Sequence, residues 1–182
     1  MDRYEPLRRR TIALVGLMGV GKSSVGRRLA TTLGLPFRDA DSEVEAAAGR
    51  SISDIFAQLG EPAFRDGERR VIARLLDGPP HVLATGGGAF MNPETRALIK
   101  SKAVSVWLKA DLDILARRVA RKDTRPLIAG KDPMEVLNAQ AEARYPAYAE
   151  ADVTVETGDA AHHVTVGQVI TALADHLGEP AE

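Results

Sequence analysis

One short segment constrains the fold more than any other part of the sequence: it reads Gly16-Leu17-Met18-Gly19-Val20-Gly21-Lys22-Ser23. It follows an apolar run at 12–15 that predicts a buried strand, and it precedes residues 23–33, whose apolar side chains recur at helical spacing. The pattern G-x-x-x-x-G-K-S between a strand and a helix is typical of a phosphate-binding loop (P-loop), in which backbone N–H groups converge on phosphate oxygens. Lys22 adds a positive charge, and the Ser23 hydroxyl is suited to Mg²⁺. The segment therefore predicts a site for a nucleoside triphosphate.

The rest of the chain alternates apolar runs with helical patterns, which is typical of βαβ units. We expect strands at residues 12–15, 35–38, 82–85, 104–108 and 153–155. We expect helices at 23–33, 42–48, from 53, at 61–76, 93–100 and 111–119, from 132, and around 166–177. Ser42, followed by Glu45 three residues later, resembles a capping box that begins the second of these helices. The alternation predicts an α/β fold with a parallel sheet that is covered by helices on both faces.

Composition excludes several classes of protein. A chain of 182 residues, 45% hydrophobic and 27% charged, has the size and balance of one globular domain. Its net charge of −1 provides no overall positive field for binding nucleic acid. The absence of cysteine excludes disulfides and thiol nucleophiles, and no uninterrupted apolar run reaches the roughly 18 residues that a membrane helix needs. We therefore expect a soluble cytoplasmic domain over residues 10–178, with flexible termini at 1–9 and 179–182 and no membrane partner.

Two aspartates come at the end of the second predicted strand. Asp39 and Asp41 stand at the carboxyl edge of the sheet, where ligands of open α/β sheets bind. A spacing of two residues in an extended chain points both carboxylates to the same side. One of them could hold Mg²⁺ through water while the other accepts a hydrogen bond from a substrate hydroxyl.

Three glycines and three arginines complete the candidate residues. Gly86, Gly87 and Gly88 follow the buried run at 82–85, so a further strand ends in backbone that lacks side chains, where another group can approach closely. Arginine suits bidentate recognition of carboxylate and phosphate. The candidates of this type are Arg65, Arg125 and Arg144. Residues 121–131 are charged and lack any apolar period, which predicts an exposed mobile loop around Arg125.

These motifs together resemble the shikimate kinase family. The resemblance covers residues 10–175 and rests on segments in the same order and at similar spacing: the P-loop, Phe37-Arg38-Asp39-Ala40-Asp41, Phe64-Arg65 with Glu68, Ala84-Thr85-Gly86-Gly87-Gly88, Arg125-Pro126-Leu127, and Arg144 before Tyr145-Pro146. It implies a three-layer P-loop kinase fold related to nucleoside monophosphate kinases, with a five-stranded parallel sheet in the order 2-3-1-4-5. It also implies a helical substrate-binding region at about 41–77 and a lid at about 121–132. The implied activity is transfer of the ATP γ-phosphate to the 3-hydroxyl of shikimate, on the route to chorismate and the aromatic amino acids.

The resemblance assigns a role to each candidate residue. Catalysis falls to Lys22, Asp41 and Arg125. The nucleotide is bound by Gly19, Val20, Gly21, Lys22, Ser23, Ser24, Arg118 and Arg125, with Arg118 against the adenine and Arg125 meeting the γ-phosphate. Shikimate is bound by Asp41, Arg65, Gly86, Gly87, Gly88 and Arg144, with the two arginines on its carboxylate and Glu68 holding the arginine cluster. Mg²⁺ is held by Ser23 and, through water, by Asp39.

Two departures from the family pattern concern the nucleotide. Ser24 stands where the family usually has threonine. The segment from Thr157 to His163 lacks the arginine and proline that usually mark the adenine-contacting loop, and we expect His162 and His163 to be surface residues.

Other functions remain open at this point. A gluconate kinase or another small-metabolite kinase would also join a P-loop to a polyol carboxylate, and a nucleotide kinase would need a second phosphate site. A nucleotide-binding switch would act on a partner rather than form a product. With no interface stripe evident, we expect a monomer.

Overall fold

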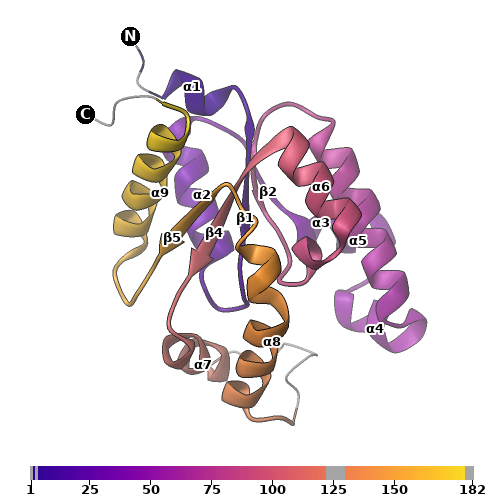
Figure 1. The fold of residues 1–182 in the computed structure, drawn as a ribbon. Helices are drawn as coiled ribbons and strands as arrows, with labels where there is room; N and C mark the ends of the chain where they lie inside the picture. The colour runs from indigo at the N-terminus through magenta and orange to yellow at the C-terminus, as the bar shows by residue number, and fades with distance from the viewer. Residues whose placement is uncertain (1, 3, 122–129, 179–182) are drawn as a thin grey trace.

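The computed structural model describes residues 2, 4–121 and 130–178, in which parallel strands form one five-stranded sheet in the order β2-β3-β1-β4-β5 (Figure 1). The strands are β1 (Thr11–Val15), β2 (Phe37–Asp39), β3 (Val82–Ala84), β4 (Ala103–Lys109) and β5 (Val153–Glu156). The predicted fold class and strand order are confirmed.

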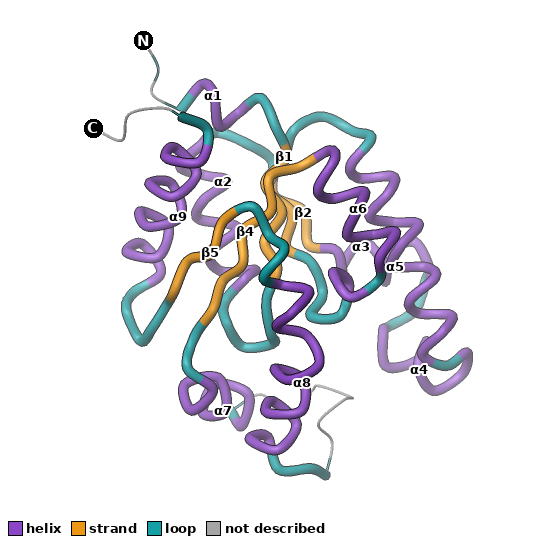
Figure 2. Tube along the Cα trace, in the orientation of Figure 1, coloured by secondary structure: helices purple, strands orange, loops and turns teal. Residues whose placement is uncertain are grey.

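Helices cover both faces of this sheet (Figure 2). They are α1 (Glu5–Arg8), α2 (Lys22–Leu33), α3 (Ala40–Ala48), α4 (Ile52–Leu59), α5 (Glu61–Leu76), α6 (Pro93–Lys102), α7 (Leu112–Ala120), α8 (Pro133–Tyr148) and α9 (His162–His176), with a 3-10 turn η1 at Ala89–Met91. Helices α2 and α9 pack together on one side of the sheet, and α5 and α6 pack together on the other (Figure 1). In the part of the chain that the structure describes, no helix has both the length and the apolar character needed to cross a membrane.

The central strands are buried along almost their whole length because both of their faces are covered. All five residues of β1 are buried, and six of the seven in β4 are buried. Such continuous burial is expected of parallel strands between two helical layers. A separate, smaller apolar cluster of Val44, Ile55, Phe64 and Val71 joins α3, α4 and α5.

The register of the sheet places three loops at one edge. Leu14 of β1 and Asp39 of β2 both pair with Ala84 of β3, which lies between them. The three strands therefore end at the same level of the sheet. There β1 leads into the P-loop, β2 into α3, and β3 into the turn at Gly86–Gly88. Ligands of open α/β sheets bind at this carboxyl edge.

The structure differs from the sequence-based expectation at the start of the chain and at α3. The segment expected to be flexible at 1–9 contains α1, whose Leu7 is only 4% exposed within the main core. The N-cap of α3 is Asp39 rather than Ser42: the Asp39 carboxylate accepts a hydrogen bond from the Ser42 backbone N–H. Strand β2 therefore ends at Asp39, and Asp41 lies in the first turn of a helix instead of in extended chain.

Burial of Leu7 gives a test of this N-terminal packing. We expect Leu7→Ala to lower the free energy of unfolding by about 2 to 4 kcal/mol, because the substitution leaves a cavity in the core. Urea unfolding of the full chain measures this. Arg9→Ala is the matched control, because its ion pair with Glu5 is exposed and should contribute less than about 0.5 kcal/mol. Equal stability of both variants would show that α1 does not pack against the core in solution.

Candidate active site

The P-loop opens onto the N-terminus of α2 with its backbone donors uncapped. Gly21 is the N-cap of α2 in the left-handed region (φ +101°) and supplies no side-chain cap. Helices α3, α4, α6 and α8 are each capped by a side chain, whereas α1, α5, α7 and α9, like α2, have no side-chain cap. Lys22 Nζ donates to the carbonyl oxygens of Gly16 (2.5 Å) and Leu17 (3.0 Å) and so lies across the loop. Uncapped N–H groups, a helix dipole and an ammonium group together form an anion site.

A second pair of groups lies beside the P-loop. The Ser23 hydroxyl donates to Asp39 Oδ2 at 2.6 Å, while Asp39 Oδ1 caps α3. Hydroxyl and carboxylate oxygens are the protein ligands that Mg²⁺ prefers, and phosphates and water usually complete its shell. The two residues that the sequence assigned to the metal are therefore adjacent, and they fit Mg²⁺ in chemical type.

Charged side chains fill the space that the three consecutive glycines leave open. A Cβ atom built on Gly86 would lie 2.8 Å from Glu68 Oε2 and 3.0 Å from Asp41 Oδ1. On Gly87 it would lie 2.9 Å from Arg144 Nη1, and on Gly88 it would lie 2.5 Å from Arg65 Nη2. At each of the three glycines an added Cβ would therefore force a charged group to move. The glycines let this turn pack directly against carboxylates and guanidinium groups from α3, α5 and α8.

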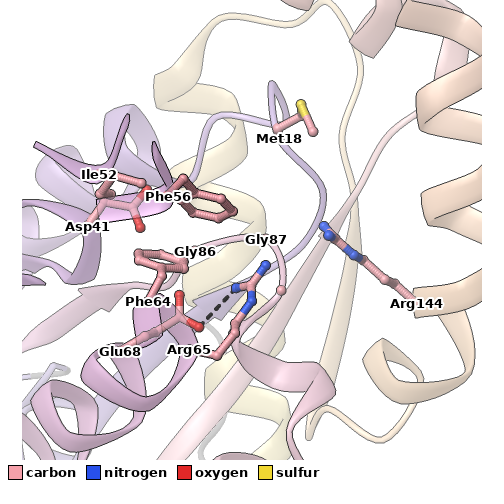
Figure 3. Close-up of a pocket in the computed structure, with 11 residues that line it drawn as sticks. Met18, Asp41, Ile52, Phe56, Phe64, Arg65, Glu68, Gly86, Gly87 and Arg144 are labelled. Atoms are coloured by element: carbon pink, nitrogen blue, oxygen red, sulfur yellow. Dashed lines mark hydrogen bonds and ion pairs between the residues drawn. The ribbon is translucent and has the colours of Figure 1, made fainter. Parts of the chain in front are cut away.

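These groups surround a cavity of about 130 Å³ (Figure 3). Arg65 comes from α5 and Arg144 from α8, on opposite sides of the glycine turn, while Ile52, Phe56 and Phe64 form an apolar wall. The Arg65 guanidinium also pairs with Glu68 at 3.0 Å. A small cavity with two arginines, two carboxylates and an apolar wall suits a small polar anion that carries hydroxyl groups.

A larger cavity, of about 520 Å³, lies directly beside the first. It is lined by the P-loop residues Gly19, Gly21, Lys22, Ser23 and Ser24 and by Asp39, Arg118 and Asp159, among others. The two cavities share four lining residues: Met18, Asp41, Gly86 and Gly87. Asp41 therefore faces both the anion site of the P-loop and the small cavity.

Glu68 is the most buried charged group of the site. Its side chain is 3% exposed, and Oε2 has no hydrogen-bond partner among the described residues. Burial raises the pKa of Glu68, the nearby Arg65 lowers it, and the negative charge of Asp41 raises it further. Glu68 thus holds Arg65 in place while it is itself poorly stabilised as an anion.

Arg118 and His162 both line the larger cavity. Arg118 donates to the carbonyl oxygens of Gly19 (3.1 Å) and Gly158 (2.9 Å) and so links the P-loop to the segment after β5. His162, which we expected to be a surface residue, lines this cavity, and a Cβ atom built on Gly21 would lie 3.7 Å from its Cε1. His162 is half-buried, whereas His163 is exposed as expected. No local sequence signal predicts the contact, because it depends on where α9 begins relative to the P-loop.

The remaining predicted residues fall into two groups. Arg125 and most of the predicted lid lie outside the described residues. Val20 is buried within the P-loop, and Ser24 is exposed at the start of α2. The site also draws on residues beyond the predicted region 41–77, since Met18, the glycine turn and Arg144 line the small cavity. The sequence-based assignment did not include the apolar wall of Ile52, Phe56 and Phe64, because apolar residues at helical spacing look like ordinary core.

Comparison with known proteins decides the family. The family model for shikimate kinase matches residues 18–174. The chain belongs to the shikimate kinase family. A shikimate kinase of Caulobacter vibrioides is 78% identical over 172 residues, which cover 94% of this chain and 86% of that protein. The solved shikimate kinase from Acinetobacter baumannii, described as a complex with shikimate, superposes with a TM-score of 0.90 at 34% identity and covers 94% of this chain and 97% of that one.

Membership of the shikimate kinase family means that the chain is an ATP-dependent kinase. The gluconokinase alternative receives only a likeness of fold: the gluconokinase from Sinorhizobium meliloti gives a TM-score of 0.58 at 20% identity, covering 92% of this chain and 93% of that one. The P-loop kinase fold is thus shared with other kinases, whereas the sequence matches favour the shikimate kinases.

The buried carboxyl of Glu68 predicts a measurable pH dependence. Its folded-state pKa lies above the ordinary value of 4.5, so the folded protein binds this proton more tightly than the unfolded chain. The resulting stabilisation is present at low pH and is lost as the pH rises through the folded-state pKa. We therefore expect the unfolding free energy of the wild type, relative to Glu68→Gln, to fall as the pH rises from about 4 to about 7. Urea unfolding of both proteins across this range measures it, and a constant difference would contradict the assignment.

Proposed function

We propose that this chain transfers the γ-phosphoryl group of ATP to the 3-hydroxyl of shikimate, which yields shikimate 3-phosphate and ADP on the route to chorismate. One observation carries the proposal: Asp41 stands where a P-loop cavity meets a small cavity that holds two arginines. A substrate whose carboxylate is bound by Arg65 and Arg144 presents its hydroxyls toward Asp41 and the P-loop. The name of the Acinetobacter baumannii structure supports shikimate as that substrate.

The proposed mechanism uses this chain's residues mainly for positioning and for neutralising charge. The backbone N–H groups of the P-loop and Lys22 bind the phosphates, and Lys22 exchanges its present carbonyl partners for phosphate oxygens. Asp41 accepts a hydrogen bond from the attacking hydroxyl and directs the oxygen toward the γ-phosphorus. Because the transition state of phosphoryl transfer is loose, the hydroxyl needs orientation more than a strong base.

We propose that Ser23 and Asp39 hold Mg²⁺. Their oxygens lie 2.6 Å apart beside the P-loop, and the metal would neutralise negative charge on the phosphates when bound. Asp39 also caps α3, so the residue assigned to the metal fixes the helix that carries Asp41. We further propose that the enzyme is a cytoplasmic monomer; light scattering after size-exclusion chromatography tests the oligomeric state.

The experiment that tests the proposed activity is ADP release from Mg²⁺-ATP with shikimate, gluconate, AMP or no acceptor. We expect a response to shikimate alone. A response to gluconate or AMP would keep the kinase activity and replace the acceptor. Release of ADP that is independent of every acceptor would support a nucleotide-binding switch instead.

Substitutions at the junction of the two cavities test the site. We expect Lys22→Ala and Asp41→Asn each to lower kcat by about a hundredfold or more, because each removes a group that acts in the transition state. Arg65→Ala should mainly raise the KM for shikimate, since its contact is the same in the ground state. Steady-state kinetics with each substrate varied in turn measures these effects. Unchanged kinetics in all three variants would refute the assignment.

The position of His162 predicts a contact with the nucleotide. We expect His162→Ala to raise the KM for ATP by about threefold to tenfold, as loss of one hydrogen bond or packing contact would, with little change in the KM for shikimate. His163→Ala is the matched control, because the neighbouring imidazole is exposed and does not line the cavity. Equal effects of the two substitutions would show that the His162 contact with the P-loop has no role in binding ATP.

A further inference from the structure

Helix α8 directs two side chains at the same backbone position. Arg144 and Tyr148 are four residues apart and therefore lie on one face of the helix. A Cβ atom on Gly87 would lie 2.9 Å from Arg144 Nη1, and the Tyr148 hydroxyl donates a hydrogen bond to the Gly87 carbonyl oxygen. Only Arg144 lines the small cavity, so Tyr148 contacts Gly87 from behind.

Burial raises the pKa of the Tyr148 hydroxyl to about 12, and Arg144 partly offsets this through its positive charge and a side-chain hydrogen bond to the hydroxyl. The hydroxyl is therefore neutral at physiological pH and keeps its proton. It can accept a hydrogen bond from the guanidinium of Arg144 while it donates one to Gly87.

The ring of Tyr148 fixes the position of this hydroxyl. Its side chain is 0% exposed, and its ring centroid lies 5.7 Å from that of Trp107 in β4 and 6.4 Å from that of Tyr145. A phenol has few rotatable bonds, and this one is packed against the sheet. The hydroxyl thus connects the rigid core to a guanidinium group and to a backbone turn, both of which face the cavity.

We propose that Tyr148 is a positioning residue for the substrate carboxylate, because it holds Arg144 and the Gly87 turn in the geometry that binds it. The proposal rests on the proposed function, in which Arg144 binds the carboxylate of shikimate. Arginine otherwise loses considerable side-chain entropy when it binds. A partner that orients Arg144 before the substrate arrives reduces that cost, as preorganisation does at other binding sites.

Tyr148→Phe separates this role from a purely structural one. The substitution keeps the ring in the aromatic cluster and removes the hydroxyl alone. It removes the donor from the half-buried Gly87 carbonyl, which is a small loss compared with the stability of a domain, so the variant should fold. Tyr145→Phe is the matched control: Tyr145 packs its ring on Trp107 at 5.0 Å and does not line the cavity.

The expected result is a selective loss of substrate binding. We expect Tyr148→Phe to raise the KM for shikimate about fivefold to twentyfold, while the KM for ATP changes less than about twofold. Tyr145→Phe should change neither. A merely structural role would instead lower Tm and leave the KM for shikimate unchanged, or raise both KM values alike, and either result would overturn the proposal.

A double-mutant cycle tests whether Tyr148 acts through Arg144. If it does, Tyr148→Phe should raise the KM for shikimate at least about threefold less in an Arg144→Ala background than in the wild type. If the fold-changes in the KM for shikimate caused by the two single substitutions simply multiply in the double variant, the proposal is overturned. The proposed function is tested separately by the wild type: if it phosphorylates a different carboxylate, the same cycle is run with that acceptor. The role of Tyr148 is then still decided by whether Tyr148→Phe raises the KM for that acceptor more than the KM for ATP.

Discussion

The register of three neighbouring strands is the constraint on which the rest of the site depends. Leu14, Ala84 and Asp39 lie side by side across β1, β3 and β2, so the P-loop, the glycine turn and α3 all begin at one height. Thr85 strengthens this arrangement, because both its backbone N–H and its hydroxyl donate to the Leu14 carbonyl oxygen. A shift of one residue in any of the three strands would separate Asp41 from the P-loop by more than a hydrogen bond can span.

The small cavity is lined by side chains of opposite charge. Asp41 and Glu68 approach Gly86 together, and Arg65 and Arg144 approach the next two residues of the turn. Burying such groups costs free energy, and the raised pKa of Glu68 reflects that cost. In the proposed function, the acceptor would place its carboxylate between the two arginines and its hydroxyls toward Asp41.

The sequence predicted those parts of the structure that depend on local patterns. Helix α5 was predicted at 61–76 and is observed at Glu61–Leu76, and the P-loop was recognised from its motif and its context. Features that depend on tertiary packing were missed or mistaken. The cap of α3 is one case: Ser42 and Glu45 fit the local pattern, but Asp39 lies at the end of β2 and caps the helix while it bonds to Ser23. Leu7, His162 and Tyr148 owe their roles to neighbours that are distant in sequence, and the roles of Arg65 and Arg144 could be stated only from family resemblance.

The two halves of the site recognise their ligands by different means, and this difference bears on how the fold changes its acceptor. In the proposed function, backbone N–H groups and Lys22 within one continuous segment bind the phosphates, and any P-loop kinase can retain that segment. The acceptor would be bound by side chains from α3, α5 and α8, elements that contact the glycine turn but do not form the P-loop. Changing the acceptor therefore requires coordinated changes in several helices, and Tyr148 ties one of them to the sheet through Trp107. A substitution at Arg144 alone would leave the Tyr148 hydroxyl without its guanidinium partner in a buried environment, so specificity at this position is a property of the pair.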